Sequence, residues 1–378
     1  MRTFILTLLL AVASAPAFAV GPSAVAAPDR SLWPDAIDGE ASFDRASRAE
    51  MLVFGHELAA SESLDDTQLL ERLKVKQVDR ASVDAVRAKY WKRLATGYAL
   101  ASAHCASDEP FCPAAKDEAA FRAAATAFTA ANDTRYNAWH ANATVFHRVY
   151  LDELLRLAAL FPRISSEVDT FSGNELSGNE PADRHFLLTF DDGPTVAGGN
   201  TDKTLAMLGA NHLKATFFLL GGNLETRLKK TDAAALAKAY EGMCVASHGW
   251  EHKSHSAWPE WQDSVTRGSA LVKDTFPASY VPLFRPPYGQ RKADSGDFFA
   301  AKHLTVALWN IDSQDWNSKV DAEQVKQRVL ALMLLWRHGV ILFHDIHAKA
   351  QVAVPWVLGQ TRSTGVTWMD CHDWPSAH

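Results

Sequence analysis

The chain has 378 residues, of which 47% are hydrophobic and 22% are charged, the composition of an ordinary soluble globular protein. Its length leaves room for two domains and a sizeable core. The formal net charge is −6 at pH 7 and no run of Lys or Arg occurs, which argues against nucleic-acid binding because neutralising phosphates requires a basic face. We therefore expect no nucleic-acid partner.

Residues 1–19 have the layout of a secretory signal peptide. Arg2 precedes an apolar stretch from Phe4 to Ala13, and Ala17-Phe18-Ala19 forms a small-x-small cleavage site. The apolar stretch is too short to cross a bilayer, although an uncleaved anchor is the alternative. We expect a periplasmic or secreted protein with no stable membrane insertion after the signal peptide is cleaved.

The four cysteines form an even set for disulfides in an exported chain. Cys105 and Cys112 flank a Pro-containing loop, and we expect them to pair. A second bridge between Cys244 and Cys371 would tie the C-terminal strand into the fold. Two separate buried thiols are the alternative for this second pair, because the sequence does not determine connectivity.

Residues 36–170 carry helical periodicity, and we expect them to form an α-helical N-terminal domain. Ser63-Leu64-Asp65-Asp66 resembles a capping box, which would begin one of the helices at Ser63. Two apolar stripes recur at helical spacing, one formed by Val83, Val86, Tyr90, Trp91, Leu94 and Tyr98 and the other by Trp139, Phe146, Tyr150, Leu154 and Leu157. Such stripes are typical of a helical core, so we assign no chemistry to this domain.

Residues 171–183 are polar, rich in Gly and Asn, and repeat Ser-Gly-Asn-Glu, which indicates a linker. Beyond it, residues 184–378 alternate short β runs with helical segments such as Ala322 to Trp336. The β runs are Phe186–Phe190, Ala215–Leu220, Met243–Ser247, Val281–Arg285, Thr305–Trp309, Val340–His344 and Val366–Asp370. Alternating β and α units imply a parallel sheet, and this many units in about 190 residues predict a closed or nearly closed (β/α) barrel.

The first of these β runs ends in two adjacent carboxylates, Asp191 and Asp192, which Gly193-Pro194 follows directly. Acids at the carboxyl end of a strand lie where α/β folds bind their ligands. Neighbouring carboxylates repel each other, which favours a cation beside them. An Asp-Asp-Gly turn closing a hairpin is the alternative interpretation of this stretch.

A pair of histidines, His248 and His252, follows the β run that ends at Ser247. Their spacing of four lets both imidazoles reach one ion from a helical turn, and with Asp192 they would make a two-His, one-carboxylate site. A solvated helix face is the alternative, and His255 could compete as a ligand although its spacing fits less well.

Three later segments also place polar residues at or after β runs. In the first, Arg285 can hold a carboxylate through two hydrogen bonds, and the prolines that follow stiffen the loop that presents the Tyr288 N–H. The second runs from Asp312 to Trp316. In the third, His344 ends an apolar strand and is placed for proton transfer. Taken singly, a proline-rich surface turn and a satisfied core histidine are the alternatives for the first and third segments.

These segments, in order, resemble the five motifs of the polysaccharide deacetylases, carbohydrate esterase family four. The matching residues are Thr189-Phe190-Asp191-Asp192-Gly193-Pro194, His248-Gly249-Trp250-Glu251-His252, Arg285-Pro286-Pro287-Tyr288-Gly289, Asp312-Ser313-Gln314-Asp315-Trp316 and Leu342-Phe343-His344. The resemblance covers roughly Arg184 to Asp370 and implies a distorted (β/α) barrel; it does not extend to the helical N-terminal half.

The resemblance implies a site built around a divalent metal ion, with zinc preferred. Asp192, His248 and His252 would bind the ion, and Asp191 would be the general base that activates the attacking water. Arg285 would pair with Asp191 and keep it ionised.

The remaining implied roles concern the acetyl group. Tyr288 would hold the oxyanion through its backbone N–H, and His344 would be the general acid that protonates the departing amine. Asp312 would position Arg285. Leu342 and Trp316 would wall the pocket for the acetyl methyl group.

One residue departs from the family pattern: Gly249 stands where a Ser or Thr hydroxyl usually braces the loop, which is expected to loosen the site without removing the metal. The resemblance implies hydrolysis of N-acetyl groups on N-acetylglucosamine units of a cell-wall or exported glycan, so the partner would be an acetylated polysaccharide. An O-deacetylase of the acetylxylan esterase type and a non-catalytic glycan-binding relative are the alternatives.

Overall fold

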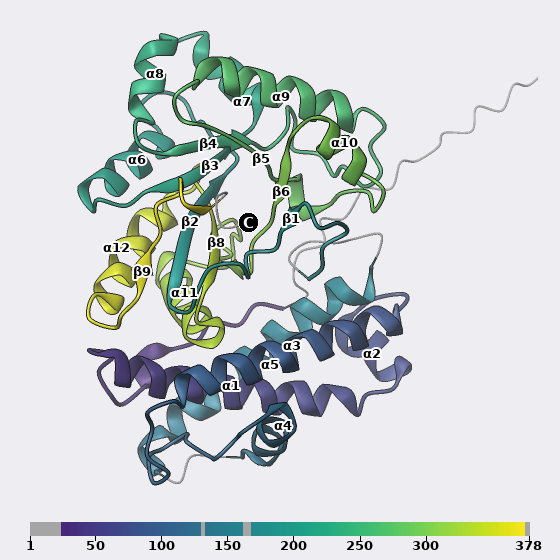
Figure 1. The fold of residues 1–378 in the computed structure, drawn as a ribbon, viewed down its shortest axis with the longest axis vertical. Helices are drawn as coiled ribbons and strands as arrows, with labels where there is room; N and C mark the ends of the chain where they lie inside the picture. Colours follow the sequence, from purple (N-terminus) through teal and green to yellow (C-terminus); the bar gives the residue numbers. More distant parts are fainter. Residues whose placement is uncertain (1–23, 130–132, 162–167, 375–378) are drawn as a thin grey trace, which may run out of the picture.

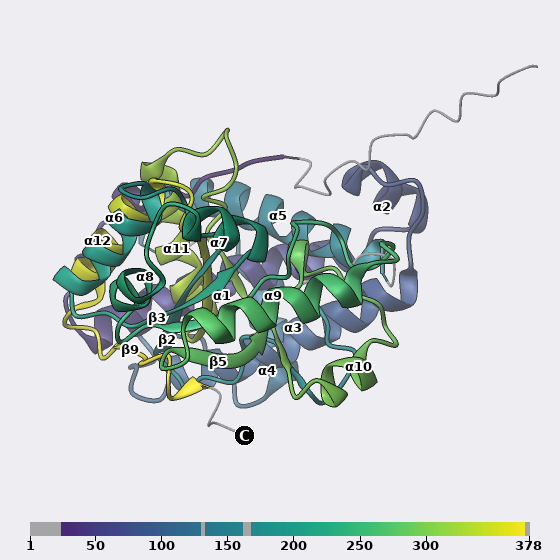
Figure 2. The ribbon, with the colours of Figure 1, turned by 90° about the horizontal axis from the view of Figure 1, so that it is seen from above.

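The computed structural model describes residues 24–129, 133–161 and 168–374. The predicted signal peptide, residues 1–19, lies outside these ranges. A layer of N-terminal helices packs against one side of a parallel (β/α) barrel, as two perpendicular views show (Figure 1; Figure 2). This arrangement confirms the predicted fold class, a distorted barrel preceded by helices.

Long helices with apolar faces form the N-terminal layer. Its helices are η1 Arg30–Leu32, α1 Glu40–Glu62, α2 Asp66–Leu73, α3 Arg80–Ala101, α4 Glu118–Ala127, η2 Thr134–Tyr136 and α5 Asn137–Ala159. The two predicted apolar stripes lie on α3 and α5, and all their residues are buried except the half-buried Leu157. The helical core was therefore predicted correctly from periodicity.

The predicted capping box is wrong in its position. Ser63 is the C-cap of α1, and α2 begins after Asp65. The Asp65 side chain accepts the Gln68 N–H at 2.8 Å, and the Gln68 side chain accepts the Asp65 N–H at 2.9 Å. The Asp65 and Gln68 side chains thus form the capping box that begins α2.

The barrel is a parallel sheet. Its strands are β1 Glu175–Leu176, β2 His185–Asp191, β3 Ala215–Leu219, β4 Cys244–Ser247, β5 Tyr280–Phe284, β6 Thr305–Ala307, β7 Ile311–Asp312, β8 Gly339–His344 and β9 Thr367–Trp368. They are ordered β1-β6-β5-β4-β3-β2-β8-β7, with β9 beside β2. Every predicted β run overlaps a strand, whereas β1 and β7 were not predicted.

Residues 305–312 close the barrel. The first part of this segment, β6, pairs with β5, and its last part, β7, pairs with β8, so one continuous stretch joins both sides of the sheet. Residues 308–310 between them lie outside both strands. The Asn310 side chain holds this bend, because its Nδ2 donates to the His338 carbonyl at 3.0 Å and its Oδ1 accepts the Val340 N–H at 2.8 Å. This irregular closure distorts the barrel.

Helices connect the strands and cover the outside of the barrel (Figure 1). They are α6 Asn200–Ala210, α7 Gly221–Leu228, α8 Ala233–Ala239, α9 Trp261–Thr275, η3 Pro287–Gly289, α10 Gly296–Ala301, α11 Ala322–Trp336 and α12 Lys349–Thr361. The bounds of α11 are those predicted. This helix packs against β7 and β8 on one side and against α1 and α3 on the other, so it joins the barrel to the N-terminal layer.

The segment 171–183, expected as a linker, contributes β1 to the sheet. Glu175 and Leu176 of this strand lie beside β6. Arg291 donates from its Nε to Glu175 Oε1 at 2.8 Å, and both side chains are buried. The connection between the two halves of the chain is thus anchored in the barrel.

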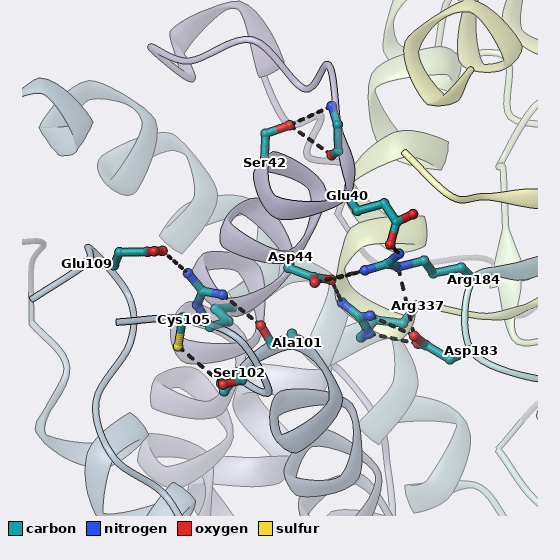
Figure 3. Close-up of polar contacts among 12 residues, drawn as sticks. Glu40, Ser42, Asp44, Ala101, Ser102, Cys105, Glu109, Asp183, Arg184 and Arg337 are labelled. Carbon is teal, nitrogen blue, oxygen red and sulfur yellow. Dashed lines mark hydrogen bonds and ion pairs between the residues drawn. The ribbon is translucent and has the colours of Figure 1, made fainter. Parts of the chain in front are cut away.

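Buried charges dock the helical layer on the barrel (Figure 3). Arg337, the C-cap residue of α11, donates to Asp44 Oδ1 of α1 at 2.7 Å and to Asp183 Oδ2 at 2.7 Å. Arg184 reaches the same Asp44 carboxylate at 2.8 Å. The Arg337 side chain is only 1% exposed, whereas its partners Asp44 and Asp183 are 16% and 28% exposed, so these pairs are partly buried.

Both predicted disulfides are present. Cys105 pairs with Cys112, with a Cα to Cα distance of 6.4 Å, and Cys244 pairs with Cys371 at 5.9 Å. The second bridge joins the start of β4 to the segment after β9, as expected, and the alternative of two separate buried thiols is wrong.

In residues 24–129, 133–161 and 168–374, no helix combines the length and the apolar character that crossing a bilayer requires.

Candidate active site

Two carboxylates stand at the carboxyl end of β2. The neighbours of β2 in the sheet, β3, β8 and β9, all run parallel to it, so the hairpin interpretation of Asp191-Asp192-Gly193 is wrong. Asp191 is the last residue of the strand, and Asp192 follows in the left-handed region with φ of 77°. This conformation is uncommon outside glycine, and it directs the two neighbouring side chains differently.

Asp191 is buried against Arg285, which follows β5. Arg285 Nη1 donates to Asp191 Oδ1 at 2.9 Å, and the same nitrogen donates to Thr189 Oγ1 at 2.8 Å. Burial raises the pKa of the Asp191 carboxyl to about 6, although Arg285 and His344 oppose this rise. The carboxyl group is therefore mostly ionised at pH 7 but remains basic enough to accept a proton.

Backbone carbonyls orient Arg285. Its Nε donates to the Ala307 carbonyl at 2.9 Å and its Nη2 donates to the Leu308 carbonyl at 3.0 Å. The expectation that Asp312 positions Arg285 is wrong. Asp312 Oδ1 instead accepts hydrogen bonds from the Gln314 N–H at 2.7 Å and from Trp316 Nε1 at 3.3 Å, and among the described residues no hydrogen bond or ion pair joins Asp312 to Arg285.

Asp192, His248 and His252 come together as predicted. One ligand atom from each residue lies within 4.8 Å of the others. Asp192 Oδ1 is 3.4 Å from His248 Nε2 and 3.5 Å from His252 Nε2. Within the described ranges, this buried oxygen has no hydrogen-bond partner. An unpartnered carboxylate oxygen facing two imidazole nitrogens fits a divalent cation, because the cation would supply the missing interaction.

The protonation of both histidines also suits metal binding. The Nδ1 atom of His248 lies 2.7 Å from the Arg285 carbonyl oxygen, an acceptor only, so Nδ1 donates and Nε2 carries the lone pair. Burial, with His252 nearby, lowers the pKa of His248 well below its ordinary value. Burial likewise lowers the pKa of His252, although Asp192 opposes the change. Both rings are thus neutral at pH 7.

The loop between these histidines depends on Gly249, which has φ of 87°. A Cβ atom there would lie 3.0 Å from Ser264 Oγ, which belongs to α9. This hydroxyl accepts the Trp250 N–H at 2.8 Å, and the Gly221 N–H donates to the Gly249 carbonyl at 2.8 Å. Neighbouring helices therefore brace the loop where Gly249 itself has no side chain.

His255 does not join the candidate metal-binding group of Asp192, His248 and His252. Its ring is 1% exposed and stacks on Phe284 with a centroid distance of 5.5 Å. Burial lowers its pKa to about 4, so the ring is neutral. The alternative in which His255 replaces one of the other histidines as a ligand receives no support from this arrangement.

His344 ends β8, and its partner is a residue that was assigned no role from the sequence. Asp315 Oδ1 lies 2.8 Å from His344 Nδ1, and Asp315 Oδ2 accepts the His344 backbone N–H at 2.8 Å. Burial disfavours the imidazolium, but the charge and hydrogen bond of Asp315, with Asp192 and Asp191, raise the pKa of His344 to about 10. The motif Asp312-Ser313-Gln314-Asp315 contains both acids, and its spacing does not show which of them faces the histidine.

The remaining predicted residues border this group. Tyr288 is 47% exposed, and its ring lies against that of His252 with a centroid distance of 4.4 Å. Trp316 is 37% exposed, and its Nε1 donates to Asp312 Oδ1 at 3.3 Å. Leu342 is buried in β8 beside Asp312. Asp312 therefore orients Trp316.

Comparisons with known proteins give the family. A family model described as polysaccharide deacetylase matches residues 178–307. The peptidoglycan-N-acetylglucosamine deacetylase of Bacillus cereus is 29% identical over 238 residues, which are 59% of this chain and 80% of that protein. The chitooligosaccharide deacetylase of Rhizobium leguminosarum bv. trifolii is 30% identical over 168 residues, covering 43% of this chain and 72% of that one.

The solved structure of a family 4 carbohydrate esterase from Streptomyces lividans, in complex with acetate, is similar to this chain, with 30% identity and a TM-score of 0.42. The similarity covers 49% of this chain and 91% of that one. The matched region contains three of the five motifs, and the relative from Rhizobium is covered over most of its length. The chain belongs to the polysaccharide deacetylase family.

Proposed function

We propose that this protein is a metal-dependent deacetylase that hydrolyses the N-acetyl groups of N-acetylglucosamine units in a cell-wall or exported glycan. The observation that carries the proposal is the pair Asp191 and His344, which lie side by side on neighbouring strands β2 and β8. Their pKa values are about 6 and about 10, so at pH 7 one is a carboxylate and the other an imidazolium. A base and an acid held beside each other are what amide hydrolysis requires.

The residues around this pair divide the remaining work. Asp192, His248 and His252 would hold a divalent cation, for which zinc suits the two imidazoles. When bound, such an ion polarises the acetyl carbonyl and makes water more acidic. The choice of zinc rests on ligand chemistry alone.

Proton transfers fall to the chain itself. Asp191 Oδ2 lies 3.8 Å from His248 Nε2, beside the metal-binding group, where the carboxylate can accept a proton from the attacking water. Arg285 holds the other oxygen of that carboxylate and fixes its direction. His344 then donates its proton to the departing amine, since Asp315 stabilises the imidazolium until that step.

Substrate contacts are proposed for Tyr288, Trp316 and Leu342. The Tyr288 backbone N–H would stabilise the oxyanion, and Trp316 with Leu342 would receive the acetyl methyl group. An acetylated polysaccharide is the proposed partner, and a periplasmic or secreted location is proposed from the signal-like N-terminus and the two disulfides.

Product analysis tests the proposal. Incubation of the zinc-loaded protein with N-acetylglucosamine oligomers should release acetate and free amine in equal amounts. Acetate without amine, formed only from acetylated xylan, would instead indicate the O-deacetylase. Absence of acetate from both substrates, together with binding to the oligomers, would indicate a non-catalytic relative.

A variant of the proposed base sharpens this test. Asp191→Asn should abolish turnover while metal stoichiometry, measured by plasma mass spectrometry, stays at the wild-type level. Parallel loss of the metal would contradict the assignment of Asp191 as base and place it among the ligands.

A further inference from the structure

Asp315 lies in the segment Asp312–Trp316, which is called the Asp315 loop below. Both the N-terminal helices and the barrel hold this loop. Glu153, on α5, accepts a hydrogen bond from Gln314 Nε2 at 2.8 Å. The same carboxylate pairs with Arg328 of α11, whose Nη2 lies 3.1 Å from Oε1 and 3.3 Å from Oε2. Arg328 Nε in turn donates to the Asp312 carbonyl at 2.8 Å. The Glu153 carboxylate thus contacts the loop directly at Gln314 and, through Arg328, at Asp312.

These contacts are largely shielded from solvent. The exposed side-chain fractions of Glu153 and Arg328 are 9% and 4%, and Gln314 is 1% exposed. The indole Nε1 of Trp336 donates to the hydroxyl oxygen of Tyr150 at 2.9 Å, which holds α11 against α5 beside this pair. Because breaking a buried ion pair from one side leaves an uncompensated charge, the arrangement is costly to distort.

The backbone of Gln314 indicates that the loop needs this support. Its φ is 55°, in the left-handed region that residues other than glycine rarely occupy. Such a conformation persists where surrounding contacts determine it. The next residue is Asp315, which directs one oxygen to the His344 ring and the other to the His344 backbone. The Gln314 N–H donates to Asp312 Oδ1 at 2.7 Å within the loop, and Glu153 anchors the Gln314 side chain from outside it. The direction of the Asp315 carboxylate therefore depends on a backbone that both contacts hold.

We propose that Glu153 is a positioning residue of the deacetylase site, through which the N-terminal helical layer keeps Asp315 bonded to His344. This inference rests on the proposed function, because it concerns the residue that would donate the proton. It gives the helices a role in the chemistry beyond covering the barrel, a role that the motifs of the barrel do not contain.

Several groups besides Asp315 influence the protonation of His344, and a pH measurement must take them into account. They come from β2, the His248 to His252 loop, β7 and the residues that follow β8. The titratable groups that interact with His344 are Asp191, Asp192, His248, His252, Asp312, Asp315, Asp345 and His347. None of them contacts Glu153 through a hydrogen bond or an ion pair in the described part of the chain.

Two variants break the proposed link at its two ends. Glu153→Ala removes the carboxylate. Gln314→Asn keeps a residue that tolerates the left-handed backbone but shortens the side chain so that it no longer reaches Glu153. Both should lower kcat about tenfold with little change in KM, and both should move the basic limb of the pH profile of kcat to lower pH.

A matched control distinguishes positioning from general stability. Asp44→Ala removes another carboxylate of the helical layer that pairs with a buried arginine, Arg337, far along the chain from the loop. It should lower Tm while leaving the pH profile unchanged. If Glu153→Ala lowers Tm in the same way and also leaves the pH profile unchanged, the proposal is overturned.

A measurement without substrate separates this inference from the proposed function. NMR titration of ring-labelled histidines, with the His344 signal assigned from a His344→Gln spectrum, reports its pKa directly. A lower pKa in Glu153→Ala and Gln314→Asn than in the wild type and in Asp44→Ala supports the link, even if no glycan tested is deacetylated. An unchanged His344 pKa in both variants would refute it.

Discussion

Replacing Asp315 with Asn removes a negative charge from beside His344 while keeping a side chain of the same shape. In the wild type, both oxygens of Asp315 contact His344 at 2.8 Å, one at the ring and one at the backbone. The single amide oxygen of the substituted side chain can still accept one of these hydrogen bonds, so the fold should survive. The imidazolium loses its main stabilising charge, and we expect the pKa of His344 to fall from about 10 to its ordinary value or below.

The size of the effect follows from that change. The interval between an ordinary histidine pKa of about 6.5 and a value of about 10 corresponds to roughly 5 kcal/mol. Because the folded-state pKa is raised, this stabilisation is fully present below about pH 6.5 and is lost as the pH rises to about 10. For activity, an imidazole with a pKa of about 6.5 is only about 3% protonated at pH 8, so kcat should fall about thirtyfold there.

Acetate release measured between pH 6 and pH 10 tests this expectation, with unfolding by urea as a second measurement. The variant should show a basic limb near neutral pH, and its stability should depend less on pH than that of the wild type. Asp321→Asn, a substitution at the exposed N-cap of α11, is the control and should match the wild type in both. If the basic limb of the folded Asp315→Asn protein coincides with that of the wild type, then Asp315 does not hold His344 protonated.

Two further predictions concern the metal-binding group and its loop. His252→Ala should lose stoichiometric zinc, whereas His255→Phe should keep it because His255 lies outside the group; equal zinc content in the two variants would remove His252 from the ligand set. Gly249→Ser should lower the free energy of unfolding by about 1–2 kcal/mol and weaken zinc binding, because φ is 87° and the new side chain would press on Ser264. Gly209→Ser, placed in open space on α6, is its control, and equal stability of the two would contradict the reasoning.

The candidate metal-binding residues were predictable because their segments follow strands of a parallel sheet. Asp192 follows β2, and His248 follows β4. In a parallel barrel the carboxyl ends of all strands meet at one rim, so residues far apart in the chain come together once the strands are recognised. The helical turn expected between His248 and His252 is wrong, because residues 248–252 form an irregular loop that Ser264 of α9 and Gly221 of α7 hold. Strand ends and fold class therefore placed these residues, whereas the conformation between the two histidines depends on tertiary contacts.

The partner of His344 could not be predicted in this way. Asp312 and Asp315 both lie in one short irregular segment, and neither strand nor helix periodicity fixes where their side chains point. The choice depends on the closure of the barrel, where residues 308–310 carry the chain from β5 to β8. The same crossing exposes the carbonyls of Ala307 and Leu308 to Arg285, which then needs no help from Asp312.

By itself, the sequence determined the helical layer, the parallel barrel and the gathering of Asp192, His248 and His252, because periodicity and strand ends are local properties, whereas the pairing of Cys244 with Cys371 stayed open until the structure showed it. Tertiary structure alone decided that Asp315 faces His344, that Asp312 orients Trp316, and that Glu153 reaches the loop between them. The physical reason is that a buried charge finds its partner through the packing of whole elements. Glu153 and Gln314 are separated by 161 positions in the chain, and only the docking of α5 beside the barrel brings them within a hydrogen bond.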